Sequence, residues 1–213
     1  MNDIKSGAYA QLACDLASVA PVFTRLKFED FQQCVSLTVS NPQSSLYISD
    51  LQIPSEKALK LFQNECLSGG MPLAVLPIES LCKPWATPDG RSKNDNGAYQ
   101  GKTARHVCDL CSEIGLQIPH EFQAMPDHLS LLLELLSIFV EAENFDSALA
   151  FAEGHFDWLL SYKDRLSKTA NLLSDLENFA EDDKQGLIAT ISFYEQIIMQ
   201  IDLGVQLFLK VRQ

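Results

Sequence analysis

Hydrophobic residues along this chain recur at the three- and four-residue spacing of α-helices, and no segment shows a convincing alternation of the β type. The spacing predicts helices over about residues 6–20, 28–39, 54–66, 102–114, 129–140, 146–160 and 163–179, with a last helix that begins near residue 181. The strongest stripe follows Leu129, where five further apolar side chains recur at helical spacing (Leu132, Leu133, Leu136, Phe139 and Val140). We therefore expect an all-α fold in which residues 1–213 form a single compact helical bundle.

Several residues with strong local preferences mark the ends of these helices. Pro21 and Pro42 stop the first two helices, and Gly115 is a typical residue just beyond a helix C-terminus. Pro54 fits the first turn of the third helix. Acidic residues are favoured where helices begin, and Glu181-Asp182-Asp183 precedes the last helical stripe.

Between about residues 68 and 101 the helical pattern is lost. This segment contains four prolines and five glycines, and it is far longer than an ordinary connection between helices. Loops of this length are typically functional. We expect a long proline- and glycine-containing loop that precedes the central helices.

The net charge of the chain disfavours some classes of binding partner. Lysine and arginine number 16 and aspartate and glutamate 28, so the formal net charge is −12. Nucleic acid and anionic membranes bind basic surfaces, so both are disfavoured, whereas a basic partner is favoured. No apolar run reaches the ~20 residues needed to span a bilayer, so stable membrane insertion is not expected. The first residues include Asp3 and Asp15 and do not resemble a secretory signal, which predicts a cytoplasmic protein with reduced cysteines.

Five short segments appear in an order that is informative together. They are Leu76-Pro77-Ile78-Glu79-Ser80-Leu81, Gly115-Leu116, Met125-Pro126-Asp127-His128-Leu129, His155-Phe156-Asp157-Trp158 and Phe193-Tyr194. This order resembles the TorD/DmsD family of redox-enzyme maturation chaperones, which is related to the NarJ type. The resemblance covers roughly residues 62–194. The chain departs from members that have Glu-Pro-Glu-Asp-His, because it lacks acidic residues directly before the Asp127-His128 pair and has Ala124-Met125-Pro126 there.

The resemblance implies a chaperone, not an enzyme, that works without a cofactor. Its client would be the precursor of a molybdopterin oxidoreductase catalytic subunit that carries a twin-arginine leader. Binding the leader or the apo subunit would delay export until the cofactor is inserted. The sequence names neither the client nor the oligomeric state, and a homodimer stays open.

Asp127 and His128 stand at the start of the strongest helix, and two roles are open for them. An acid at this position can cap its own helix, and a histidine beside a core helix is most often structural. The resemblance instead places Asp127, His128 and Pro126 in a peptide-binding site. There the carboxylate would receive a guanidinium, and His128 would be kept neutral by the positive helix start.

Glu79 lies in the long loop, between Pro77 and Trp85. It can be a solvated loop acid or, as the resemblance implies, a second carboxylate on the rim of the same groove. In the second interpretation Pro77 and Trp85 belong to the peptide-binding site as well.

Two other classes of function compete with the chaperone. A metal or redox protein could use His106 with the CxxC pair Cys108 and Cys111. The pair lies in the middle of a predicted helix, without the second CxxC of a closed zinc site, so buried structural cysteine is the better interpretation. A helical adaptor without a peptide groove is the remaining alternative.

Overall fold

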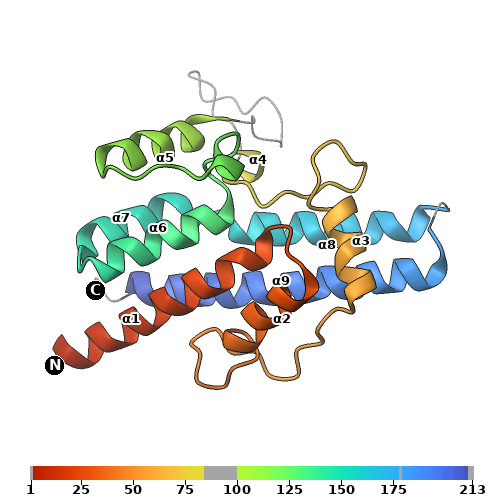
Figure 1. Cartoon of the computed structure of the whole chain (residues 1–213), viewed down its shortest axis with the longest axis horizontal. Helices are drawn as coiled ribbons and strands as arrows, with labels where there is room; N and C mark the ends of the chain where they lie inside the picture. Colours follow the sequence, from red (N-terminus) through yellow and green to blue (C-terminus); the bar gives the residue numbers. More distant parts are fainter. Residues whose placement is uncertain (1, 84–99, 178, 211–213) are drawn as a thin grey trace.

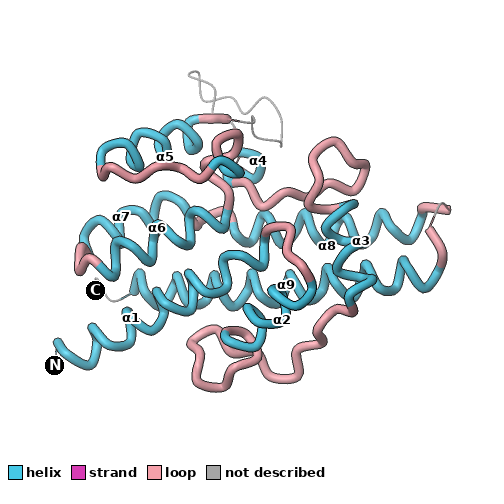
Figure 2. The backbone as a smooth tube through the Cα atoms, in the orientation of Figure 1, coloured by secondary structure: helices cyan, strands magenta, loops and turns pink. Residues whose placement is uncertain are grey.

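The computed structural model describes residues 2–83, 100–177 and 179–210, and in these ranges the fold is all-α, as the sequence predicts. The helices in chain order are α1 (Asn2–Val19), α2 (Phe28–Leu37), α3 (Glu56–Glu65), α4 (Glu79–Cys82), α5 (Lys102–Glu113), α6 (Leu129–Glu141), α7 (Phe145–His155), α8 (Leu159–Asp175) and α9 (Glu181–Leu209), with 3₁₀ turns η1 (Ala20–Phe23) and η2 (His120–Phe122). Figure 1 shows α4 and α5 at one side of an elongated helical body, with α6 and α7 beside them. Loops lie at its periphery (Figure 2).

The longest helix, α9, runs through the body and organises the core. It packs against α8 along its length and also contacts α3, α7 and α1. Its buried side includes Phe193, Tyr194 and Ile197, and the buried apolar residues form one cluster from Leu12 to Phe208. Gly204 permits the close approach of α1, because a Cβ at this position would lie 3.0 Å from Leu12 Cδ1.

Most of the local helix signals in the sequence act as expected. Gly115 adopts a positive φ of 72° directly beyond the C-terminus of α5, a conformation that glycine adopts at no steric cost. Pro21 stands in the first turn of η1, where α1 ends. The acidic residues 181–183 occupy the first turn of α9. Leu129, Leu132, Leu133, Leu136, Phe139 and Val140 are all buried along α6.

Other boundaries differ from the prediction. Ser55, not Pro54, begins α3, because its side chain accepts a hydrogen bond from the Ala58 N–H. The segment predicted as one helix over residues 146–160 ends at His155, and α8 begins at Leu159. Trp158 stabilises this break, since its indole N–H donates to the carbonyl of His155 across 2.7 Å. The predicted long loop also contains the short helix α4.

No helix in the described ranges is both long enough and apolar enough to cross a lipid bilayer.

Candidate functional site

Two distant segments singled out in the sequence lie side by side. Ile78 and His128 form an isolated antiparallel bridge. The Glu79 N–H donates to the Asp127 carbonyl at 3.1 Å, and the Leu129 N–H donates to the Pro77 carbonyl at 2.8 Å. Through these bonds the backbone of the long loop fixes α4 against the start of α6.

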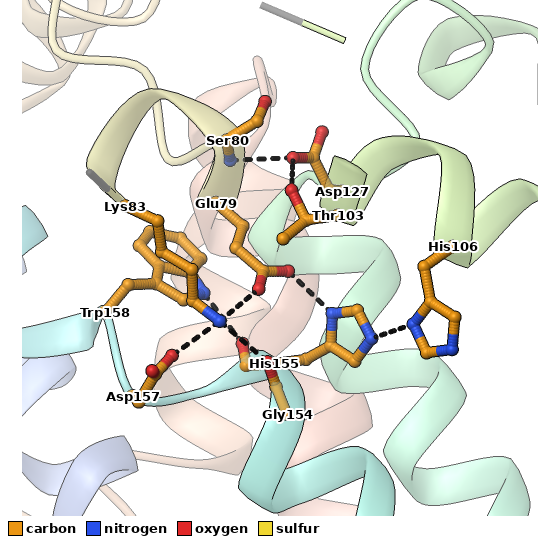
Figure 3. Close-up of polar contacts among 10 residues, drawn as sticks. All are labelled: Glu79, Ser80, Lys83, Thr103, His106, Asp127, Gly154, His155, Asp157 and Trp158. Carbon is orange, nitrogen blue, oxygen red and sulfur yellow. Dashed lines mark hydrogen bonds and ion pairs between the residues drawn. The ribbon is translucent and has the colours of Figure 1, made fainter. Parts of the chain in front are cut away.

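The Asp127 side chain strengthens this junction. Its Oδ2 accepts hydrogen bonds from the Ser80 N–H at 2.7 Å and from the Thr103 hydroxyl at 3.0 Å (Figure 3). The carboxylate therefore caps α4 and ties α5 to it, and does not cap its own helix, which was one of the two roles considered from the sequence. Asp127 is 0 % exposed, so it does not lie open on a groove surface in this structure.

One side of this junction lacks hydrogen-bond partners. Asp127 Oδ1 and Ser80 Oγ are buried, and neither atom has a hydrogen-bond partner among the residues that the structure describes. In the described parts of the chain, no cation forms an ion pair with Asp127. Buried polar atoms are normally satisfied, so these two adjacent residues leave capacity for an added donor.

His128 is the residue that caps α6. Its Nδ1 accepts from the Ser130 N–H at 3.2 Å, so the ring proton of the neutral imidazole is on Nε2. Burial lowers the pKa of His128 to about 4. The neutral state expected from the sequence is therefore supported, but the dominant cause is burial, not the helix start.

Glu79 belongs to a separate buried cluster. It is 0 % exposed, which rules out the solvated loop acid considered from the sequence. Its Oε2 lies 2.7 Å from His155 Nδ1, and its Oε1 lies 2.7 Å from Lys83 Nζ, an ion pair without hydrogen-bond alignment (Figure 3). Both oxygens of this carboxylate are therefore engaged inside the protein.

Lys83 connects this cluster to the surface. Its ammonium donates to the Gly154 carbonyl at 2.7 Å and pairs with Asp157 at 2.6 Å. Burial works against its charge, but the bonds to Asp157 and Glu79 outweigh burial and raise the pKa of Lys83. The lysine thus stays cationic where α4 meets the end of α7.

A second histidine extends the cluster from Glu79 to α5. His155 is 2 % exposed, and its Nε2 lies 2.8 Å from Nδ1 of the exposed His106, with the two rings parallel within 3°. An ionised carboxylate only accepts hydrogen bonds, so the Nδ1–H of His155 donates to Glu79, and the other ring nitrogen of His155 makes the contact with His106.

The remaining predicted site residues fall into two groups. Pro77 and Pro126 are buried and lie in the paired segments, next to Glu79 and Asp127. Trp85 lies outside the described residues. The sequence analysis did not assign His155, His106 and Lys83 to the site, although His155 stands in one of the segments that carry the resemblance.

The CxxC pair does not form the three-residue ligand set considered from the sequence. His106 is bonded to His155, and no group of three or more histidine, cysteine or acidic residues is arranged for a metal in the ranges that the structure covers. Cys111 is buried as expected, but Cys108 is exposed, which corrects the interpretation of the pair as buried cysteine. Burial raises the pKa of both thiols.

Comparison with known proteins does not assign the chain to a family. No family model, no curated protein and no solved structure matches the chain.

Proposed function

We propose that this protein is a maturation chaperone of the TorD/DmsD type, which binds the twin-arginine leader of a molybdopterin oxidoreductase precursor. Leader binding in the cytoplasm would hold the precursor back from export until its cofactor is inserted. The chain would supply a recognition surface and no catalytic group.

One observation carries this proposal. The junction of Asp127 with Ser80 joins two of the segments on which the resemblance rests, although they are 47 residues apart. The Glu79–His155 contact brings in a third segment from 76 residues away. Three of the five segments therefore belong to one connected unit, as expected if they serve a shared role.

The chemistry of the junction suits an arginine. A guanidinium is a planar cation with five N–H donors, and its hydrogen bonds to a carboxylate are about twice as strong as neutral ones. Asp127 Oδ1 and Ser80 Oγ are acceptors without hydrogen-bond partners in the described part of the chain. Asp127 is fully buried, so a side chain that reaches Oδ1 must enter by a local opening of the junction. Pairing with an arginine would stabilise the buried negative charge and so favour this opening, because no described cation pairs with Asp127.

Glu79 takes a different role in this proposal. Its oxygens are already engaged by His155 and Lys83, so it does not receive a second arginine. Instead it anchors α4, the helix that presents Ser80. The net charge of −12 would attract the basic leader from a distance, and this attraction weakens as salt is added.

The proposal is tested by titrating a fluorescent twin-arginine leader peptide against the wild type and Asp127→Asn. Asparagine keeps an oxygen for the Ser80 N–H and the Thr103 hydroxyl but removes the charge. We expect the affinity to fall by about thirtyfold or more, since truncating one partner of a buried charge pair costs at least about 2 kcal/mol.

The matched control is Asp157→Asn, which removes the same charge from a side chain that is 65 % exposed. It should leave the affinity nearly unchanged at moderate salt. A twin-lysine leader should bind more weakly than the twin-arginine leader to the wild type, because an ammonium cannot make the planar bidentate contact. Equal affinities for wild type and Asp127→Asn would show that Asp127 is not the arginine site.

A further inference from the structure

The CxxC pair faces a cavity that the proposed function does not use. The cavity has a volume of about 360 Å³ and lies between α5 and the connector that leads to η2. Its lining residues are Cys108, Cys111, Ser112, Leu116, Gln117, Ile118 and Gln123. The cysteines are its only thiol groups, and the polar side chains beside them are uncharged.

Helix geometry places the two thiols together. Residues three apart on a helix are neighbours, with Cβ atoms about 5–6 Å apart. Two metal–thiolate bonds of about 2.3 Å span roughly 4.6 Å, so the pair can hold one ion between its sulfurs. Cys108 is exposed and gives access from solvent, whereas Cys111 is buried at the inner side.

Helix geometry also limits the number of ligands. Two residues along a helix rotate a side chain by about 200°, so His106 and Cys108 lie on opposite sides of α5. His106 is moreover bonded to His155. Zinc sites need three or four protein ligands, so this cavity is unsuited to zinc. Soft monovalent ions accept thiolates alone, and thiolate ligands select Cu(I) among the common metals.

We propose that Cys108 and Cys111 form a two-coordinate site for a soft monovalent metal ion of the Cu(I) type. Binding forms two copper–sulfur bonds and releases two protons, so that two thiols and one Cu(I) ion give a bis-thiolate complex with a charge of −1. No electron is transferred.

The test uses the reduced full chain under anaerobic conditions, with Cu(I) as the probe and a coloured Cu(I) chelator as the competitor. We expect the wild type to retain one equivalent of Cu(I) against a chelator concentration that strips Cys108→Ser. Because Cys108 is exposed, this variant should fold normally, and circular dichroism would verify it. Cys111→Ser should lose the ion as well.

Cys14→Ser is the matched control, since Cys14 is an exposed thiol on α1, away from the cavity. It should retain Cu(I) as the wild type does. Retention by Cys108→Ser, loss in Cys14→Ser, or a wild type that retains no Cu(I) would each overturn the proposal. Zn(II) binding that equals Cu(I) binding and disappears in His106→Ala would also overturn it, because it would reveal a site with three ligands.

Discussion

Glu79 and Asp127 are both fully buried acids at the junction of α4 and α6, and their surroundings satisfy them to different degrees. Glu79 has His155 on one oxygen and the ammonium of Lys83 on the other. Asp127 has two neutral donors on Oδ2 and, within the described ranges, no hydrogen-bond partner on Oδ1. One carboxylate is therefore a completed structural link, and the other retains the capacity to bind an additional donor.

The difference has a simple physical origin. Glu79 extends into the space between α4 and α7, where the end of α7 supplies His155 and the carbonyl that also binds Lys83. Asp127 is shorter and faces the first turn of α4, where the Ser80 N–H and the Thr103 hydroxyl of α5 are its donors. The buried charge of Glu79 is tolerated because of its ion pairs, and that of Asp127 because it lies at a helix N-terminus.

The largest effect is expected for Glu79→Gln. We expect it to lower the free energy of unfolding by about 3 kcal/mol, the lower end of the range for breaking a buried ion pair. Lys83 keeps Asp157 and the Gly154 carbonyl, which limits the loss. Urea unfolding at pH 7.5, followed by circular dichroism, measures the change.

Asp157→Asn is the control for this variant, because it removes the exposed partner of the same lysine. It should cost less than about 0.5 kcal/mol. If Glu79→Gln were as mild as Asp157→Asn, the Glu79 cluster would not be the completed link that its contacts indicate.

The second effect tests whether water is excluded from the Asp127 side of the junction. It is measured through the pH dependence of stability that the neighbouring His128 contributes. Its pKa is about 4 in the folded protein and about 6.5 for a free imidazole, so the unfolded chain takes up the proton first as the pH falls. The stability from the neutral ring is complete above pH 6.5 and is lost as the pH falls towards 4. At pH 5 the loss from this group should be about 2 kcal/mol.

His128→Asn isolates this contribution. Asparagine can still cap α6 with its side-chain oxygen, but it does not titrate. The unfolding free energies of the wild type and the variant at pH 7.5 and pH 5 give the pH dependence of stability for each protein. The contributions of the other titrating groups cancel when the two are compared. Identical slopes would mean that water reaches this side of the junction, and Asp127 would then be hydrated rather than awaiting a donor.

The sequence predicted the features that depend on neighbouring residues. Gly115, the apolar stripe after Leu129 and the acids at residues 181–183 all act within one or two turns of their own positions. It also selected the two segments that pair through Pro77 and Asp127. These predictions succeeded because helix ends and faces are encoded locally.

The features that it missed depend on contacts between distant residues. Burial of Glu79 requires His155, 76 residues away, and the link to His106 spans a further 49. Asp127 has the local appearance of a cap for α6, yet its carboxylate is used by α4. Neither outcome follows from spacing along the chain, since each depends on where tertiary packing places the partner helix.

Among the variants of buried residues, the smallest effect on stability is expected for Asp127→Asn, the variant used in the leader titration. Its oxygen can replace Oδ2 as the acceptor for Ser80 and Thr103, and its amide can take the position of Oδ1, which has no donor to lose. We expect the free energy of unfolding to fall by about 1 kcal/mol or less, because only the charge assistance of two hydrogen bonds is removed. The same urea unfolding at pH 7.5 measures this change beside that of Glu79→Gln.

A loss of stability as large as that of Glu79→Gln would show that Oδ1 already has a partner in solution, and the distinction between the two carboxylates would fail. A small loss together with a large fall in leader affinity would separate binding from stability at Asp127.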